Sequence, residues 1–232
     1  MTEKILVILH QKTSTPGRVG QMLVQRGYEL EKCRPALGEV LPETLEDYAG
    51  VVMFGGPMSA NDNDDFIHQE INWIDLPLKE KTPFLGICLG AQMFAKNLGG
   101  TVGPHPEGEV EIGYRPLDAT DAGKAMLDWP GIVYHWNREG FTAPDSATIL
   151  ARGDIYDQQA FSYGECAYGI QFHSELTLAM MHRWTVRGAE RLTLPKAQKA
   201  VDHLRGRLRH DERTRIWLEE FLNIWLANDP RK

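Results

Sequence analysis

Residues 83–92 read Pro83-Phe-Leu-Gly-Ile-Cys88-Leu-Gly90-Ala-Gln92, an apolar run that passes through Gly-x-Cys-x-Gly into a helical pattern. A strand, a tight turn and a helix in this order form the context of a nucleophile elbow. Gly86 and Gly90 carry no side chain where the backbone must fold sharply around Cys88. The turn lifts the sulfur out of a sheet and places it at a helix N-terminus, whose amides favour the thiolate and can stabilise an oxyanion. The stretch therefore predicts a nucleophilic cysteine between a buried strand and a helix.

Short apolar runs alternate with helix-compatible segments on both sides of this turn. Predicted strands cover residues 4–10, 28–33, 50–54 and 83–87, and predicted helices cover 18–26, 65–76 and 92–98. This alternation is typical of an α/β fold with an open, mostly parallel sheet flanked by helices. Strand-like runs at 111–117, 132–136, 148–152, 159–162 and 166–172 follow with few helices between them. They predict a small antiparallel sheet on that core, before a further helix at 177–191.

The last forty residues differ from the rest of the chain. Two apolar series recur there at helical spacing: Ala197, Val201, Leu204 and Leu208, then Trp217, Phe221 and Trp225. We therefore predict an α/β domain at 1–194 and a C-terminal amphipathic helical extension at 195–232. Two helices that cover apolar surface are favoured over a membrane-binding role. The aromatic residues have two possible partners, their own chain or a second copy, so a homodimer stays open.

Composition and charge exclude several classes of protein. The formal net charge is −7, which argues against a nucleic-acid binder, because such proteins need a basic surface. No apolar run is long enough to span a bilayer, and the first residues lack the pattern of a secretory signal. Cys33, Cys88 and Cys166 form no C-x-x-C pair, so neither a disulfide framework nor a cysteine zinc site is indicated. We expect a cytoplasmic protein without a metal or cofactor.

A partner for the cysteine is present in Gly169-Ile-Gln-Phe-His173-Ser-Glu175. A nucleophilic thiol needs a base, and the base needs a group that orients it. On an extended segment, residues two apart point to the same side. Glu175 can therefore hold one ring nitrogen of His173 while the other faces the sulfur. Cys88, His173 and Glu175 are the predicted catalytic residues.

Three motifs together resemble the signatures of class I (triad) glutamine amidotransferases: Gly55-Gly56-Pro57-Met58-Ser59, the cysteine turn and the His-x-Glu segment. The resemblance covers about residues 1–190 and is strongest to stand-alone proteins similar to the amidotransferase domain of GMP synthase. It implies that Cys88 attacks the side-chain amide of glutamine and forms a γ-glutamyl thioester. It also implies an oxyanion hole made by the backbone amides of Gly56 and Leu89, with Gly55 beside the substrate.

Other pocket residues follow from the same resemblance and keep a second interpretation. Gln92 either holds the glutamine substrate or lies on the surface of its helix. His135 and Trp136 either line the pocket or pack within a strand. Ser174 stands where proline is usual, and 137–139 read Asn-Arg-Glu where relatives usually carry His-Gly-Asp. This last departure leaves γ-glutamyl conjugates open as substrates beside glutamine.

Three functions are therefore compared. The first is a glutaminase or amidotransferase that releases ammonia for an acceptor. The chain contains no Gly-x-x-x-x-Gly-Lys-Ser/Thr phosphate loop, so a synthase reaction would need a partner synthetase protein. The second is a γ-glutamyl peptidase or hydrolase that uses the same thioester. The third is a catalytically silent partner-binding module, against which the intact Cys-His-Glu set argues.

Overall fold

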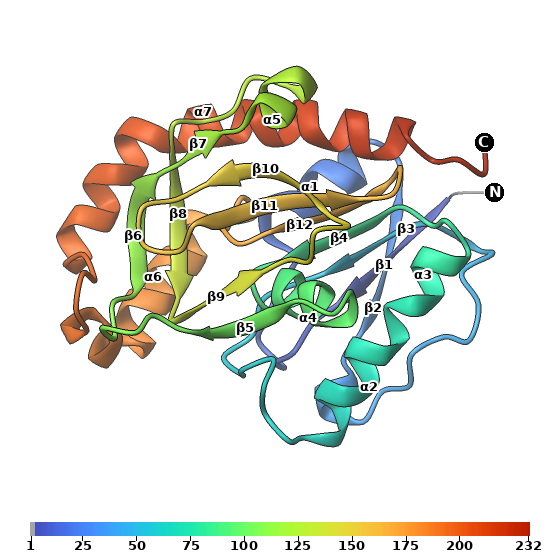
Figure 1. Cartoon of the computed structure of the whole chain (residues 1–232), viewed down its shortest axis with the longest axis horizontal. Helices are drawn as coiled ribbons and strands as arrows, with labels where there is room; N and C mark the ends of the chain where they lie inside the picture. The colour runs from blue at the N-terminus through green and yellow to red at the C-terminus, as the bar shows by residue number, and fades with distance from the viewer. Residues whose placement is uncertain (1–2) are drawn as a thin grey trace.

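The main sheet contains eight of the strands that the computed structural model describes over residues 3–232 (Figure 1). Their order in the sheet is β2-β1-β3-β4-β12-β11-β10-β7. In that order the strands span Glu29–Cys33, Lys4–Ile8, Tyr48–Met53, Phe84–Ile87, Ala167–Ile170, Gln158–Tyr163, Thr148–Arg152 and Asp118–Ala119. The first five are mutually parallel, and the last three are added antiparallel. The predicted open, mostly parallel sheet is confirmed.

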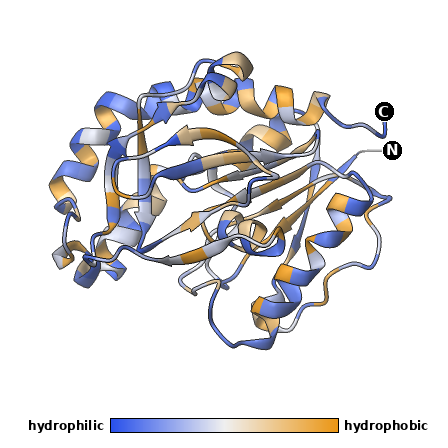
Figure 2. Cartoon of the chain, in the orientation of Figure 1, coloured by the Kyte–Doolittle hydropathy of each residue, from blue (hydrophilic) through white to orange (hydrophobic). Residues whose placement is uncertain are grey.

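Helices cover both faces of this sheet. The α-helices are α1 Gly17–Gln25, α2 Asp65–Trp73, α3 Asp75–Lys79, α4 Leu89–Asn97, α5 Asp121–Met126, α6 Leu178–Arg187 and α7 Ala200–Ala227, with 3-10 turns η1 Pro35–Leu37 and η2 Ala189–Thr193. Alternate residues of β1 enter different cores: Ile5 and Val7 pack with α1 and α7, whereas Leu6 and Ile8 pack with α2 and α4. A parallel strand buried on both faces is apolar at successive positions, which explains the apolar run at 5–9. Figure 2 shows hydrophobic residues along these central strands.

The antiparallel part is arranged differently from the prediction. A single small sheet was expected over 111–172, but two separate two-stranded sheets form: β5 Thr101–Pro104 with β9 Glu139–Thr142, and β6 Glu111–Pro116 with β8 Ile132–Asn137. The other runs instead extend the main sheet, and β12 pairs in parallel with β4. Sequence patterns reveal strands but not their partners, because pairing depends on which edge the chain returns to.

The C-terminal segment forms one continuous helix, α7, where two helices were predicted. Trp217, Phe221 and Trp225 are all 0% exposed and belong to the same core as α1 and β1, so they bury against their own chain. The first half of α7 behaves differently, since Leu204 is 38% exposed and Leu208 is 89% exposed. Figure 1 shows α7 running along one side of the sheet. The domain boundary between residues 194 and 195 stays a prediction.

Within residues 3–232, no helix combines the length and the apolar character needed to cross a membrane.

Candidate active site

Cys88 occupies the junction between β4, which ends at Ile87, and α4, which begins at Leu89. Its backbone angles are φ 53° and ψ −108°, a conformation that is strained for a residue with a side chain. A methyl group on Gly86 would come within 2.6 Å of the carbonyl oxygen of Gly90, and one on Gly90 would overlap the carbonyl oxygen of Met53. Both glycines are therefore required by close packing. Strain at a single position between a strand and a helix is the geometry of a nucleophile elbow.

His173 and Glu175 follow the end of β12 and are nearly completely buried, at 5% and 2% exposure. The imidazole Nδ1 lies 2.7 Å from Glu175 Oε1. Their segment is an irregular turn and not the extended strand that was predicted, but the two side chains still meet. Backbone bonds fix it: the amide of His173 donates to the carbonyl oxygen of Tyr134 at 2.8 Å, and that of Arg18 donates to the carbonyl oxygen of Glu175 at 2.8 Å.

The charge state of His173 is set by its two neighbours. Burial alone lowers the pKa of an imidazole, but the negative charges of Glu175 and Cys88 outweigh it and raise the pKa of His173 to about 10. Nε2 has no hydrogen-bond partner among residues 3–232, and Cys88 is close enough to raise the pKa of His173. The arrangement therefore favours an imidazolium at His173 near neutral pH. Nδ1 is paired with Glu175, so Nε2 is the ring nitrogen that can transfer a proton.

The Gly55-Gly56 turn follows β3 and completes this side of the site. A methyl group placed on Gly55 would lie 3.2 Å from Cε1 of His173 and 3.7 Å from Sγ of Cys88. Both side chains therefore lie close to the same point of main chain. A methyl group on Gly56 would lie 3.0 Å from a side-chain methyl of Leu89. A side chain on either glycine would therefore crowd His173 or Leu89, which favours glycine at both positions.

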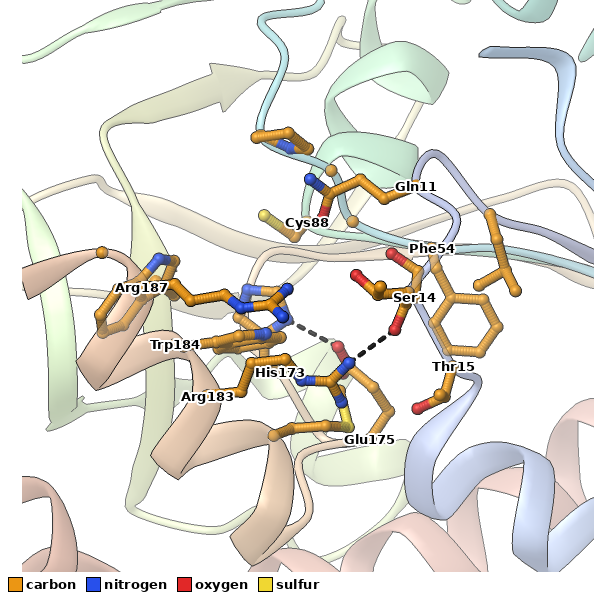
Figure 3. A pocket seen from close by; sticks show the side chains of 18 of the residues that line it. Gln11, Ser14, Thr15, Phe54, Cys88, His173, Glu175, Arg183, Trp184 and Arg187 are labelled. Atoms are coloured by element: carbon orange, nitrogen blue, oxygen red, sulfur yellow. Dashed lines mark hydrogen bonds and ion pairs between the residues drawn. The ribbon is translucent and has the colours of Figure 1, made fainter. Parts of the chain in front are cut away.

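A cavity of about 250 Å³ opens over these residues (Figure 3). Of the residues predicted for the site, six line it: Gly55, Gly56, Cys88, Trp136, His173 and Glu175. Leu89, Gln92 and His135 are not among its lining residues.

The burial of Gln92 and of His135 decides between the two interpretations given for each residue. Gln92 is 4% exposed, so the surface interpretation is wrong, and its amide donates to the carbonyl oxygen of Glu139 at 2.9 Å and to Oε1 of Gln171 at 3.1 Å. His135 is 0% exposed and lies 3.3 Å from a carboxylate oxygen of Glu111. Burial lowers its pKa. It packs inside the protein while its neighbour Trp136 faces the cavity, as alternation along β8 requires.

The other two thiols lie away from the cavity. Cys33 and Cys166 are buried, and desolvation raises the pKa of each to about 11. A thiol in such surroundings is protonated and unreactive at neutral pH. Among residues 3–232, no group of three or more His, Cys, Asp and Glu side chains is placed to hold a metal ion.

Several cavity residues were not singled out from the sequence. The ring of Trp184 on α6 lies in a T-shaped arrangement with that of His173, with centroids 4.7 Å apart. Arg183 and Arg187 of the same helix and Arg191 of η2 also line the cavity. Figure 3 shows Arg183 and Arg187 on the same side of the pocket as Trp184 and His173. The spacing of four between these arginines was a readable sign that one face of the helix carries them.

Several known proteins are similar to this chain in sequence. The glutamine amidotransferase-like protein YfeJ of Salmonella typhimurium is 30% identical over 185 residues, which cover 75% of this chain and 77% of YfeJ. A glutamine-hydrolysing GMP synthase subunit of Methanococcus aeolicus is 31% identical over 139 residues, or 58% of this chain and 69% of that protein. Gamma-glutamyl peptidase 5 of Arabidopsis thaliana is 32% identical over 139 residues, or 56% of this chain and 55% of the peptidase.

Solved structures extend the similarity over the whole fold. A glutamine amidotransferase from Methylobacillus flagellatus superposes with a TM-score of 0.89 at 27% identity, covering 100% of this chain and 97% of its own. One from Thermotoga maritima gives 0.87 at 30% identity, covering 97% and 99%. Residues 16–186 match the family described as "Glutamine amidotransferase class-I". This chain belongs to the class I glutamine amidotransferase family.

Proposed function

We propose that this chain hydrolyses the side-chain amide of glutamine, or of another γ-glutamyl amide, through a covalent thioester on Cys88. The single observation that carries the proposal is the buried contact of 2.7 Å between His173 and Glu175, beside a cysteine at a strained strand-to-helix turn. A carboxylate that holds an imidazole next to a thiol is the arrangement needed for nucleophilic catalysis.

In the first step the Cys88 thiolate attacks the γ-carbonyl carbon, and the carbonyl oxygen becomes an oxyanion. The backbone amides of Gly56 and Leu89 are the proposed donors to that oxygen. Leu89 begins α4, where amides lack partners within the helix. Removing one donor of this kind from other enzymes costs about 10²–10³ in kcat.

In the second step the tetrahedral intermediate collapses. The carbon–nitrogen bond breaks, the imidazolium of His173 gives its proton to the departing nitrogen, and ammonia leaves. A water molecule then attacks the γ-glutamyl thioester, while His173 takes one of its protons. The carbon–sulfur bond breaks and releases glutamate, and the thiolate of Cys88 is restored. Glu175 stabilises the imidazolium both before it gives its proton to the leaving nitrogen and after it takes one from water.

The fate of the ammonia points to a partner. The similar GMP synthase protein of Methanococcus aeolicus is by its name one subunit of a larger enzyme. We propose that ammonia from this chain serves an acceptor activated by a synthetase partner, in analogy with that enzyme.

A second candidate is hydrolysis of γ-glutamyl conjugates, with an amine in place of ammonia as the leaving group. Arg183, Arg187 and Arg191 line the cavity, and none of them forms an ion pair with a carboxylate of residues 3–232. Guanidinium groups bind carboxylates through paired hydrogen bonds. Glu190 also lines the cavity and offsets one of these charges, but the remaining two still exceed what the single carboxylate of glutamine uses. This observation favours a conjugate whose amine part is itself anionic, such as a γ-glutamyl peptide with a free carboxylate.

The test compares glutamine with a γ-glutamyl dipeptide and with the same dipeptide amidated at its C-terminus. Ammonia from glutamine supports the first function, and preferential cleavage of the free-acid dipeptide supports the second. Cys88→Ala is expected to abolish both, whereas Cys166→Ala, which removes a buried thiol outside the cavity, is the matched control. If the wild-type protein cleaves none of the three, the chain is a silent binding module and the proposal fails.

A further inference from the structure

A buried, hydrogen-bonded His–Glu pair contacts the main chain of Gly55, next to Cys88. His10 follows β1 and Glu70 lies on α2, and their side chains are both 0% exposed. His10 Nε2 is 2.7 Å from Glu70 Oε2, and His10 Nδ1 is 3.3 Å from the carbonyl oxygen of Gly55. The other carboxylate oxygen, Oε1, has no hydrogen-bond partner among residues 3–232. Burial of a carboxylate with one unpaired oxygen costs free energy of folding, so we expect the pair to have a role other than stability.

The hydrogen bonds fix where the protons are. A carbonyl oxygen can only accept, so Nδ1 of His10 must donate to Gly55 and therefore carries a proton. Nε2 then either donates to the carboxylate of Glu70 or accepts from its protonated form. In both cases Glu70 holds the ring in the orientation that aims Nδ1 at the Gly55 carbonyl.

The hydrogen bond from His10 to the Gly55 carbonyl also fixes the direction of the next amide, the N–H of Gly56. The carbonyl of Gly55 and the N–H of Gly56 belong to one peptide unit, and in a trans peptide they point in opposite directions. With the carbonyl held toward His10, the N–H of Gly56 points away from His10. A methyl group on Gly56 would lie 2.9 Å from Cβ of His10, and one on Gly55 would lie 3.3 Å from Cβ of Cys88, so this peptide lies between His10 and Cys88.

We propose that His10 is a positioning residue, oriented by Glu70, which holds the Gly55–Gly56 peptide so that its N–H faces the oxyanion. Two glycines in sequence allow such a peptide to rotate easily, and the hydrogen bond from Nδ1 removes that freedom. The inference rests on the proposed function, since it assigns a support to the proposed oxyanion hole. His10 itself touches neither the substrate nor the sulfur.

Two substitutions separate the two hydrogen bonds of the ring. His10→Asn places an amide N–H near the position of Nδ1 and retains a donor for Gly55. His10→Gln reaches toward Glu70 but offers no donor at the position of Nδ1. We expect His10→Gln to lower kcat for amide hydrolysis by about 10- to 100-fold, with little change in KM, and His10→Asn to recover most of the loss.

A second reaction at the same sulfur distinguishes positioning from general damage. Alkylation of Cys88 by iodoacetamide forms no oxyanion, so its rate should be the same in wild type and both variants. Equal hydrolysis by wild type and His10→Gln would overturn the inference while leaving the proposed function intact. A parallel fall in alkylation would also overturn it. Wild-type protein that hydrolyses no γ-glutamyl amide would refute the proposed function, and this inference with it.

A measurement on the wild-type protein keeps the test independent of how the variants fold. A long-range ¹H–¹⁵N spectrum of the histidine rings reports which nitrogen carries a proton. Near neutral pH we expect Nδ1 of His10 to be protonated. An unprotonated Nδ1 would rule out donation to Gly55.

Discussion

Replacing Trp217 by alanine tests whether α7 is part of the core that supports the active site. The indole is 0% exposed and packs against three aromatic rings, with centroid distances of 5.1 Å to Trp129, 5.2 Å to Phe172 and 5.0 Å to Phe221. Phe172 immediately precedes His173 in the chain. Truncation of the indole therefore leaves a cavity beside Phe172, the residue before the proposed catalytic histidine.

The expected loss of unfolding free energy follows from this packing. Large-to-small replacement of a buried aromatic residue costs about 3–5 kcal/mol. The indole Nε1 of Trp217 finds no partner among residues 3–232, so no hydrogen bond is lost, and removal of a buried unpaired donor offsets part of the cost. We therefore expect a loss of about 3 kcal/mol for Trp217→Ala. Leu208→Ala, on the same helix at 89% exposure, should change stability by no more than about 0.5 kcal/mol.

Guanidinium unfolding followed by far-ultraviolet circular dichroism measures these differences. Wild type and both variants should unfold in a single transition with similar m values, because α7 shares one core with the sheet. A loss of less than about 1 kcal/mol for Trp217→Ala would refute this reasoning. So would an early separate transition of helical signal, which would mean that the segment unfolds as an independent extension.

Two further predictions concern the site. Because the pKa of His173 is raised to about 10 by its anionic neighbours, kcat/KM should hold at neutral pH and fall as pH approaches that value and the imidazolium loses its proton. In Glu175→Gln the raising charge is gone, so the fall should move to lower pH in a pH–rate profile; an unmoved profile would contradict the assignment. Gly90→Ala, whose methyl group meets the Met53 carbonyl, should cost stability at the upper end of about 1–3 kcal/mol in thermal unfolding. Gly131→Ala, with open space around it, should stay within about 0.5 kcal/mol, and equal losses would show that packing at the turn is not the cause.

Local patterns were sufficient to predict the elements that carry the proposed catalytic residues. The apolar run that enters Gly-x-Cys-x-Gly corresponds to β4, Cys88 and α4 in order. The spacing of His173 and Glu175 predicted their contact, although the backbone between them is a turn. The first prediction succeeds because strand–turn–helix geometry is a property of neighbouring residues. The second holds although its premise of an extended backbone was wrong, because the turn also brings the two side chains together.

Features that depend on distant residues were not predictable. Nothing in the sequence near His10 indicates that Glu70, sixty residues later, reaches its ring. Strand pairing was misassigned for the same reason, since β12 returns beside β4 and not within a separate antiparallel sheet. Two separate apolar series, one ending at Leu208 and one starting at Trp217, made one long helix look like two. Helices continue through polar segments when their ends are packed, so a local loss of apolar residues does not end them.

Of the three cysteines, only Cys88 is expected to react with a thiol reagent, so labelling of this residue can be used to count active sites. Since desolvation keeps Cys33 and Cys166 protonated at neutral pH, a thiol reagent applied briefly to the folded protein should consume one equivalent and stop. Intact-mass measurement of that single adduct would count the competent molecules in any preparation, and protection by a bound γ-glutamyl compound would report occupancy without a turnover assay.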